Sequence, residues 1–227
     1  MRSILRLLAV LLVTSVFSPA EAQTEYFTEG ERLISGSTFV QQGEDLRGVG
    51  FEVEIAPSSR VAFTFGYGGA DAEMVAGSDG IREDGEIVTW SGAITGYPLR
   101  QGEGGAFTLG VGVGVGHTRS TVTLRFQEFV ERFDNSAITL TANLLAAGVV
   151  TKAESPIRGV LQVQAGAAML LGESDVAYAQ LIGAGFGAGF AVSPRVLVVV
   201  EPAALVTISS GATTITLVGS LGLAYAF

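Results

Sequence analysis

Large apolar residues alternate with small or polar residues along most of this chain. Between Thr213 and Phe227 the odd positions include Ile215, Leu217 and Leu221, whereas the even positions carry mainly Thr, Ser, Gly and Ala. An alternation of period two predicts a β-strand with two unlike faces. The polar face of a strand in a soluble sheet carries charged residues, but the second face of this segment has none.

The same alternation recurs through the rest of the chain. It is clearest in the segments 49–55, 61–67, 107–115, 138–144, 161–169 and 178–192. In several of these segments glycine occupies every second position, as at Gly110, Gly112 and Gly114. Segments of about ten residues that are apolar on one face, small or polar on the other and separated by turns are typical of a transmembrane β-barrel.

The turns predict the number of strands. Four short connections, at 56–59, 97–105, 151–157 and 192–195, have the composition of tight periplasmic turns. Because a barrel with both termini in the periplasm has one such turn fewer than half its strands, four turns imply ten strands. The expected strands are 31–42, 47–56, 60–70, 85–97, 106–120, 135–150, 158–171, 177–191, 195–208 and 213–227. The first has no clear faces, so eight strands, with 31–56 packed differently, is the alternative.

Composition excludes several other classes of protein. The 31 glycines argue against a helical bundle, because glycine destabilises helices. A net charge of −9 argues against a nucleic-acid binder, which needs a basic face. Without cysteine the chain has neither a disulfide framework nor a thiolate metal site. In a narrow barrel, small residues on the concave side relieve crowding between strands, which explains the glycines.

The N-terminus predicts export. Arg2 and Arg6 flank the start of an apolar run from Leu7 to Phe17, and a small-x-small pattern closes at Ala22. This arrangement is typical of a secretory signal peptide, and the run is shorter than the roughly 20 apolar residues of a transmembrane helix. We therefore expect a signal peptide at 1–22, a short periplasmic segment at 23–30 and a barrel domain at 31–227.

Taken together, these features make the sequence resemble the small outer-membrane barrels of Gram-negative bacteria, the OmpX- and OmpA-like superfamily. The end of the chain contributes to the resemblance, because Leu221, Leu223 and Tyr225 alternate up to a terminal Phe227. In this superfamily such an ending is the signal read by the barrel assembly machinery. The resemblance also implies a monomer in contact with outer-membrane lipid and lipopolysaccharide.

The parity of a position, odd or even within its strand, predicts which polar residues face the lumen of the barrel. Buried charges are normally paired, so we expect these residues to form an internal salt-bridge and hydrogen-bond network. A narrow lumen filled in this way is the favoured interpretation, and a cation-preferring pore lined by glutamates is the alternative. The predicted lumen residues are Glu52, Glu54, Arg60, Asn143, Arg158, Gln162, Gln164 and Glu201.

Two longer extracellular loops are expected at 70–84 and 117–135. The first is acidic, but its spacing does not match a calcium-binding loop, so it is interpreted as solvated. The second begins at His117, the only histidine, which we interpret as an exposed loop residue.

His117 and Ser120 invite comparison with the lipid A deacylases, in which a similar pair lies two residues apart. At a spacing of three, the two side chains would face opposite sides of a strand and could not act as base and nucleophile. We expect no catalytic, metal or cofactor site, and a structural or surface-interaction role such as envelope integrity, adhesion or host contact.

Overall fold

The computed structural model describes residues 32–43, 46–76, 81–101, 106–126, 129–151, 155, 157–172, 176–209 and 212–227. The expected signal peptide at 1–22 and the segment at 23–30 lie outside these ranges. The described residues form ten strands. They are β1 (Leu33–Gln42), β2 (Leu46–Ser58), β3 (Val61–Ala76), β4 (Ile81–Leu99), β5 (Thr108–Phe126), β6 (Phe129–Val149), β7 (Ile157–Gly172), β8 (Val176–Ser193), β9 (Val196–Ser209) and β10 (Ala212–Ala226).

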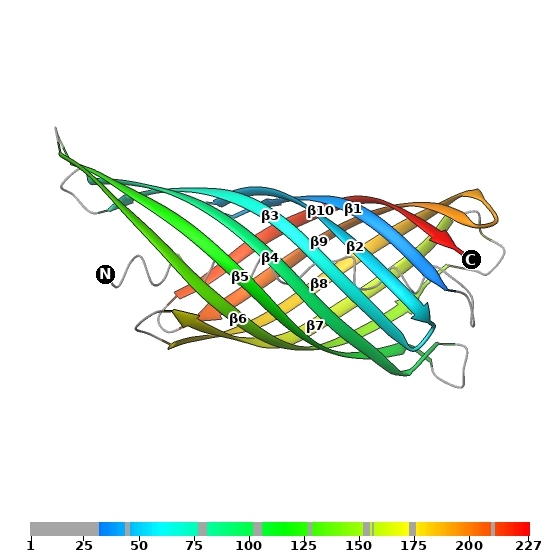
Figure 1. The fold of residues 1–227 in the computed structure, drawn as a ribbon. Helices are drawn as coiled ribbons and strands as arrows, with labels where there is room; N and C mark the ends of the chain where they lie inside the picture. Colours follow the sequence, from blue (N-terminus) through cyan, green and yellow to red (C-terminus); the bar gives the residue numbers. More distant parts are fainter. Residues whose placement is uncertain are drawn as a thin grey trace.

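The strands close into an antiparallel up-and-down barrel (Figure 1). Every strand pairs with its neighbours in the sequence, and β1 pairs with β10 over its whole length, from Leu33 opposite Ala226 to Gln42 opposite Leu217. The prediction of ten strands is therefore confirmed, and the eight-stranded alternative is wrong. Among the described residues no helix is long and apolar enough to cross a membrane.

The barrel wall has its large apolar side chains on the outside and its small and polar side chains on the inside, the opposite of a soluble protein. In β10 the large apolar residues point outward and are exposed, whereas the small and hydroxyl residues between them are buried. Leu217, for example, is 61% exposed, while its neighbours Thr216 and Val218 are 1% and 5% exposed. The parity of the sequence thus separates an outer apolar face from a lumen face that carries glycine, alanine, serine and threonine.

Two parts of the prediction are wrong about where strands end. The expected loop at 70–84 is in fact the hairpin end of β3 and β4, which stay paired from Val61 opposite Gly96 to Ala76 opposite Ile81. The expected loop at 117–135 is the hairpin end of β5 and β6, paired as far as Phe126 opposite Phe129. Both hairpins continue past the end of the short β1–β2 hairpin (Figure 1). Polar residues on both faces hide the strand period there, because neither face contacts lipid or a core.

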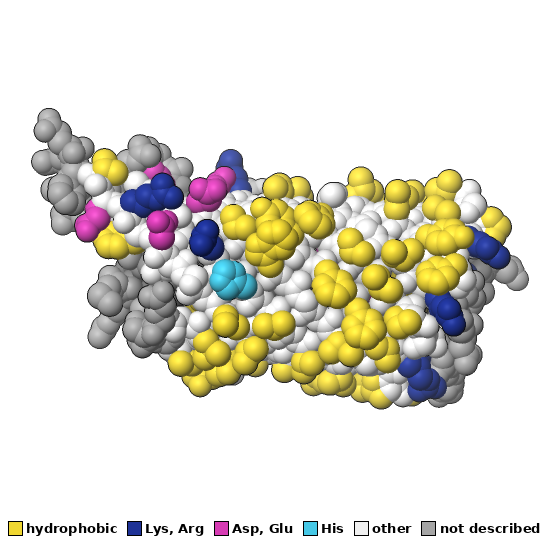
Figure 2. Space-filling view, in the orientation of Figure 1, with side chains coloured by type: hydrophobic (Ala, Val, Ile, Leu, Met, Phe, Trp, Pro, Cys, Tyr) yellow, Lys and Arg dark blue, Asp and Glu magenta, His cyan; other side chains and the backbone are white. Residues whose placement is uncertain are grey.

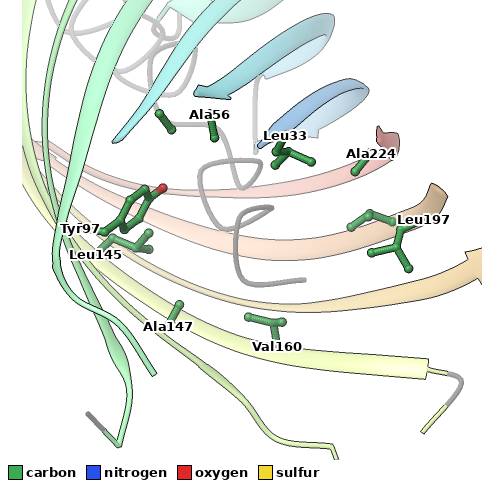
Figure 3. Close-up of a cluster of buried hydrophobic side chains, with 10 residues drawn as sticks. Leu33, Ala56, Tyr97, Leu145, Ala147, Val160, Leu197 and Ala224 are labelled. Carbon is green, nitrogen blue, oxygen red and sulfur yellow. The ribbon is translucent and has the colours of Figure 1, made fainter. Parts of the chain in front are cut away.

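An apolar collar lines the lumen at the end of the barrel that holds the C-terminus (Figure 3). Its ten buried residues come from eight of the ten strands. The collar comprises Leu33, Ala56, Ala62, Tyr97, Leu145, Ala147, Val160, Leu197, Val199 and Ala224. A second buried apolar cluster, which includes Phe39, Leu181 and Leu205, lies on the lumen side of other parts of the wall.

Candidate functional site

The lumen is the first candidate site, because acidic side chains are buried on it. Glu52 and Glu54 follow each other on the inward face of β2, and Glu201 lies on the inward face of β9. Glu54 and Glu201 are each 1% exposed, and Glu52 is 6% exposed. Ser220 on β10, which pairs with Glu201 in the strand register, donates a hydrogen bond of 3.3 Å to the Glu201 carboxylate.

The other predicted lumen residues have different positions. Gln162 is buried on β7, and Asn143, Arg158 and Gln164 are half-buried on β6 and β7. Arg60 is the exception, because it lies in the turn after β2 and is exposed. Parity supports its lumen position less than that of the others, since the parity of a strand does not continue into the turn that ends it.

Glycines on the lumen side provide space for side chains from neighbouring strands. A Cβ atom at Gly50 would overlap the Phe39 ring, and one at Gly112 would overlap the Asn143 amide. A Cβ at Gly183 would come within 2.7 Å of Leu205 and 2.9 Å of Gln164. These glycines do not border empty space, because the long side chains of the next strand lie against the wall where a Cβ is missing.

Hydroxyl groups make up much of the remaining lumen surface. Thr89 and Thr118 are joined by a 2.9 Å hydrogen bond between their buried hydroxyls. Ser120, Thr139 and Thr207 are buried on the lumen side, and their hydroxyl oxygens have no hydrogen-bond partner among the described residues. Because a buried hydroxyl without a partner is costly, we expect ordered water to bind these groups.

Arg100 and Gln101 are two buried or half-buried residues whose contacts the sequence did not reveal. The Arg100 guanidinium is buried, lies 5.6 Å from the centre of the Tyr97 ring and donates a 2.6 Å hydrogen bond to the Ser59 carbonyl. Gln101 accepts a 2.7 Å hydrogen bond from the Val149 amide and donates one of 3.4 Å to the Val149 carbonyl. Both residues fall in the stretch 97–105 that was predicted to be a turn. The period-two alternation, which indicates the lumen residues of strands, therefore gave no signal for them.

His117 and Ser120 do lie on opposite faces of the wall. His117 is exposed on the outer face of β5, and Ser120 is 1% exposed on the lumen face. The expectation of a loop histidine is wrong, because His117 is a strand residue that pairs with Trp90 and Ile138. Among the described residues there is no cluster of three or more potential metal ligands.

The outer face carries a row of aromatic side chains about midway along the strands β2 to β5. Phe51, Tyr67, Trp90 and His117 are register partners on four successive strands, β2 to β5. The rings of Phe51 and Tyr67 are 5.5 Å apart between centroids, and those of Tyr67 and Trp90 are 4.4 Å apart. Trp90 is 59% exposed, so this aromatic row is a surface feature.

Charged residues stand four positions along from the aromatic row, towards the hairpin ends. Arg47, Asp71 and Glu86 are register partners on β2, β3 and β4, and all three are exposed on the outer face. Further around, Asp134 accepts a 2.7 Å hydrogen bond from Thr121 and lies 3.5 Å from Arg132. The hydrogen bond from Thr121, assisted by the positive charge of Arg132, lowers the pKa of Asp134 below its usual value.

The geometry defines a class of protein, and the comparisons agree with it. No family model and no curated protein matches the sequence. Among solved structures, the translocator domain of the autotransporter NalP from Neisseria meningitidis is 12% identical, with a TM-score of 0.52 over 92% of each chain. The transport unit of the autotransporter AIDA-I from Escherichia coli is also 12% identical, with a TM-score of 0.51 over 89% of this chain and 92% of that one.

A third similar structure is Ail, the attachment invasion locus protein of Yersinia pestis. It is 10% identical, with a TM-score of 0.39 over 88% of this chain and 100% of that chain. At these identities the similarity of NalP and AIDA-I shows the fold alone. The chain has the fold of the outer-membrane β-barrel proteins, and the resemblance drawn from the sequence holds at that level.

Proposed function

We propose that this protein is an integral outer-membrane β-barrel of a Gram-negative bacterium, exported by the signal peptide at 1–22, with a structural or surface-interaction role. Envelope integrity, adhesion and host contact are the roles that such a barrel can serve. The observation that carries the proposal is the apolar band on the outer face of the barrel. Figure 2 shows apolar side chains over the middle of the wall and charged side chains gathered towards its two ends.

The strands β8, β9 and β10 make this band most clearly. Their outward residues, from Tyr178 to Val192, Val196 to Ile208 and Thr213 to Phe227, include no charged side chain. In water, so large an exposed apolar surface would drive aggregation. In a bilayer the same surface is favourable, and a closed barrel satisfies the backbone hydrogen bonds that lipid cannot.

The positions of the termini support an orientation in the membrane. The first described residue, Arg32, exchanges backbone hydrogen bonds with Phe227, so β1 begins beside the end of the chain. With this end in the periplasm, the longer β3–β4 and β5–β6 hairpins project outside the cell, where a surface-interaction role would require them. The terminal Leu221, Leu223, Tyr225 and Phe227 then lie at the periplasmic end, where the assembly machinery would read them, whereas lipopolysaccharide would surround the opposite end of the barrel.

A filled lumen is the second part of the proposal. It is supported by the side chains that lie over the wall glycines and by the apolar collar, and the three buried glutamates favour a cation-preferring channel as the alternative. Conductance of the refolded protein in a planar bilayer separates the two. We expect no stable open level. A stable cation-selective level that falls in Glu52→Gln or Glu54→Gln, but not in the external variant Asp134→Asn, would establish the channel instead.

We also propose that the protein is not an enzyme, since the one histidine faces outward and Ser120, the serine nearest to it in the sequence, faces the lumen. A catalytic role for His117 predicts that His117→Ala would abolish a modification of lipid A seen on expression of the wild-type chain. We expect the lipid A of cells expressing either form to have the same mass spectrum.

A further inference from the structure

The outer wall has a groove between the aromatic row and the charged residues Arg47, Asp71 and Glu86. Its volume is about 1020 Å³, near the upper end of the roughly 300–1,000 Å³ that is typical of ligand pockets. Val40, Val49, Val88 and Leu217 contribute outward apolar side chains, and Gly69 and Gly219 line its floor. Phe51 and Tyr67 of the aromatic row also line it.

The glycines are what make the wall concave here. Val40, Val49, Gly69 and Val88 are successive register partners on β1 to β4, so the missing side chain at Gly69 interrupts a row of valines. Gly219 is the register partner of Val40 on β10 and interrupts the same row on the other side. Neither glycine is required by packing, because a Cβ at either position would meet its nearest atom at 3.6 or 3.8 Å, an ordinary contact.

The charges at the rim of the groove indicate what kind of headgroup would fit. Arg47, Asp71 and Glu86 also line the groove, one cation beside two anions. Among the residues that the structure describes, none of the three is in an ion pair. A phosphate would complement Arg47, and an ammonium group that donates hydrogen bonds would complement the two carboxylates.

We propose that this groove binds one molecule of an ethanolamine glycerophospholipid. An acyl chain lies against the valines and the glycine floor, the phosphate contacts Arg47 and the primary ammonium contacts Asp71 and Glu86. A purely anionic headgroup would be repelled by the carboxylates of Asp71 and Glu86. A choline headgroup carries a positive charge but has no N–H to donate to them. The inference rests on the proposed function, because it places this face of the barrel against lipid.

Trp90 provides the probe, because it is the only tryptophan in the chain and contacts Tyr67 at the edge of the groove. The experiment titrates phosphatidylethanolamine with brominated acyl chains into the full-length barrel, refolded in micelles of a detergent without bromine, and follows quenching of the Trp90 fluorescence. We expect saturable quenching at one lipid per barrel. Brominated phosphatidylglycerol and brominated phosphatidylcholine are titrated in the same way for comparison. Unlabelled lipopolysaccharide is added in a separate experiment as a competitor of phosphatidylethanolamine.

The variants test whether lipid binding depends on the shape of the groove or only on the apolar character of the wall. Gly69→Leu places a side chain in the groove, its Cβ would come no closer than 3.6 Å to any neighbouring atom, and it should weaken binding at least tenfold. Gly96→Leu is the matched control, because Gly96 is also an outward strand glycine, lies outside the groove and has no atom within 3.9 Å of a new Cβ. Arg47→Gln should weaken binding of both phosphatidylethanolamine and phosphatidylglycerol about fivefold, which corresponds to about 1 kcal/mol.

Asp71→Asn combined with Glu86→Gln should weaken binding of phosphatidylethanolamine only. Equal binding of all lipids, displacement by lipopolysaccharide at equal concentration, or quenching that Gly69→Leu leaves unchanged would each overturn the proposal. Circular dichroism and the migration of unboiled samples are measured on the same preparations. A folded barrel without saturable quenching refutes only the lipid site, whereas a chain that does not fold in detergent refutes the proposed function.

Discussion

At the scale of single residues, the lumen wall depends on where side chains are absent as much as on where they are present. Gly112 lies against Asn143 and Thr95, so even a methyl group at this position would force the Asn143 amide and the Thr95 hydroxyl to move. Asn143 was expected to be a lumen residue from its parity alone. The glycine that makes room for it could not be identified in the same way, because that requires knowing that β5 and β6 place Gly112 opposite Asn143.

The packing around Gly112 leads to a stability prediction. Gly112→Ala should lower the free energy of unfolding by about 1–3 kcal/mol, as expected for overpacking a tight site. Gly96→Ala, on the open outer face, should change it by less than about 1 kcal/mol. Urea titrations of both variants refolded into lipid vesicles measure the difference. Equal stability of the two variants would contradict the tight packing described for the lumen.

Asp134 gives a second prediction at this scale, outside the apolar band. The hydrogen bond from Thr121 stabilises the charged carboxylate, so Thr121→Val should raise the pKa of Asp134 towards its ordinary value. Because the pKa is lowered in the folded state, this contribution to stability is present at neutral pH and is lost as the pH falls through the folded-state value. Carbon-detected NMR titration measures the shift. Thr123→Val, which removes a hydroxyl from the same strand, should leave the pKa of Asp134 unchanged.

At the scale of the strands, the period of two was enough to locate most of the wall. It predicted β2, β7, β8, β9 and β10 to within a few residues, because each has one face against lipid and one against the lumen. It was wrong about the hairpin ends of β3 to β6, where residues 131–136 are exposed on both faces. It also missed the course of β4 beyond Gly96, where a shift in register with β5 keeps Tyr97 buried and precedes Arg100.

Different segments of one strand should therefore respond differently to a charge. Val115 is 52% exposed within the apolar band of β5, and Thr123 lies on the same face of the same strand beyond it. Val115→Arg should cost about 2–4 kcal/mol of stability in a bilayer if it lies near the midplane, whereas Thr123→Arg should cost little. Unfolding titrations in lipid vesicles compare the two. Equal tolerance of both substitutions would show that β5 does not cross lipid where we place it.

A further prediction concerns the connection between β4 and β5. Gln101 joins this connection to the end of β6 through two hydrogen bonds with Val149. Gln101→Ala should cost about 1–2 kcal/mol of stability, because the Val149 amide loses its partner. Gln101→Glu retains the acceptor for that amide and should recover part of the loss. Urea titrations of both variants test this, and a Gln101→Ala variant as stable as the wild type would show that the contact contributes nothing.

At the scale of the whole molecule, the abundance of glycine and the high mean hydropathy have one explanation. The apolar residues cover the outer face, while glycine and other small residues occupy the lumen face, where the strands curve most tightly. The separation of the two faces along the sequence is enough to predict the closed barrel. It could not predict the outer groove, because Gly69 and Gly219 are far apart in the sequence and come into one row, on either side of Val40 and Val49, only when β1 closes the barrel between β2 and β10.

Depth-dependent quenching of Trp90 in a bilayer tests the central claim, membrane integration, most directly. The full-length protein is refolded into vesicles whose lipids carry bromine at one of several positions along the acyl chain. Trp90 is exposed on the outer face near the row of charged residues, so its fluorescence should be quenched by bound acyl chains, most strongly by bromine close to the headgroup. A folded chain that stays in solution, with Trp90 unquenched by bromine at every depth, would contradict membrane integration.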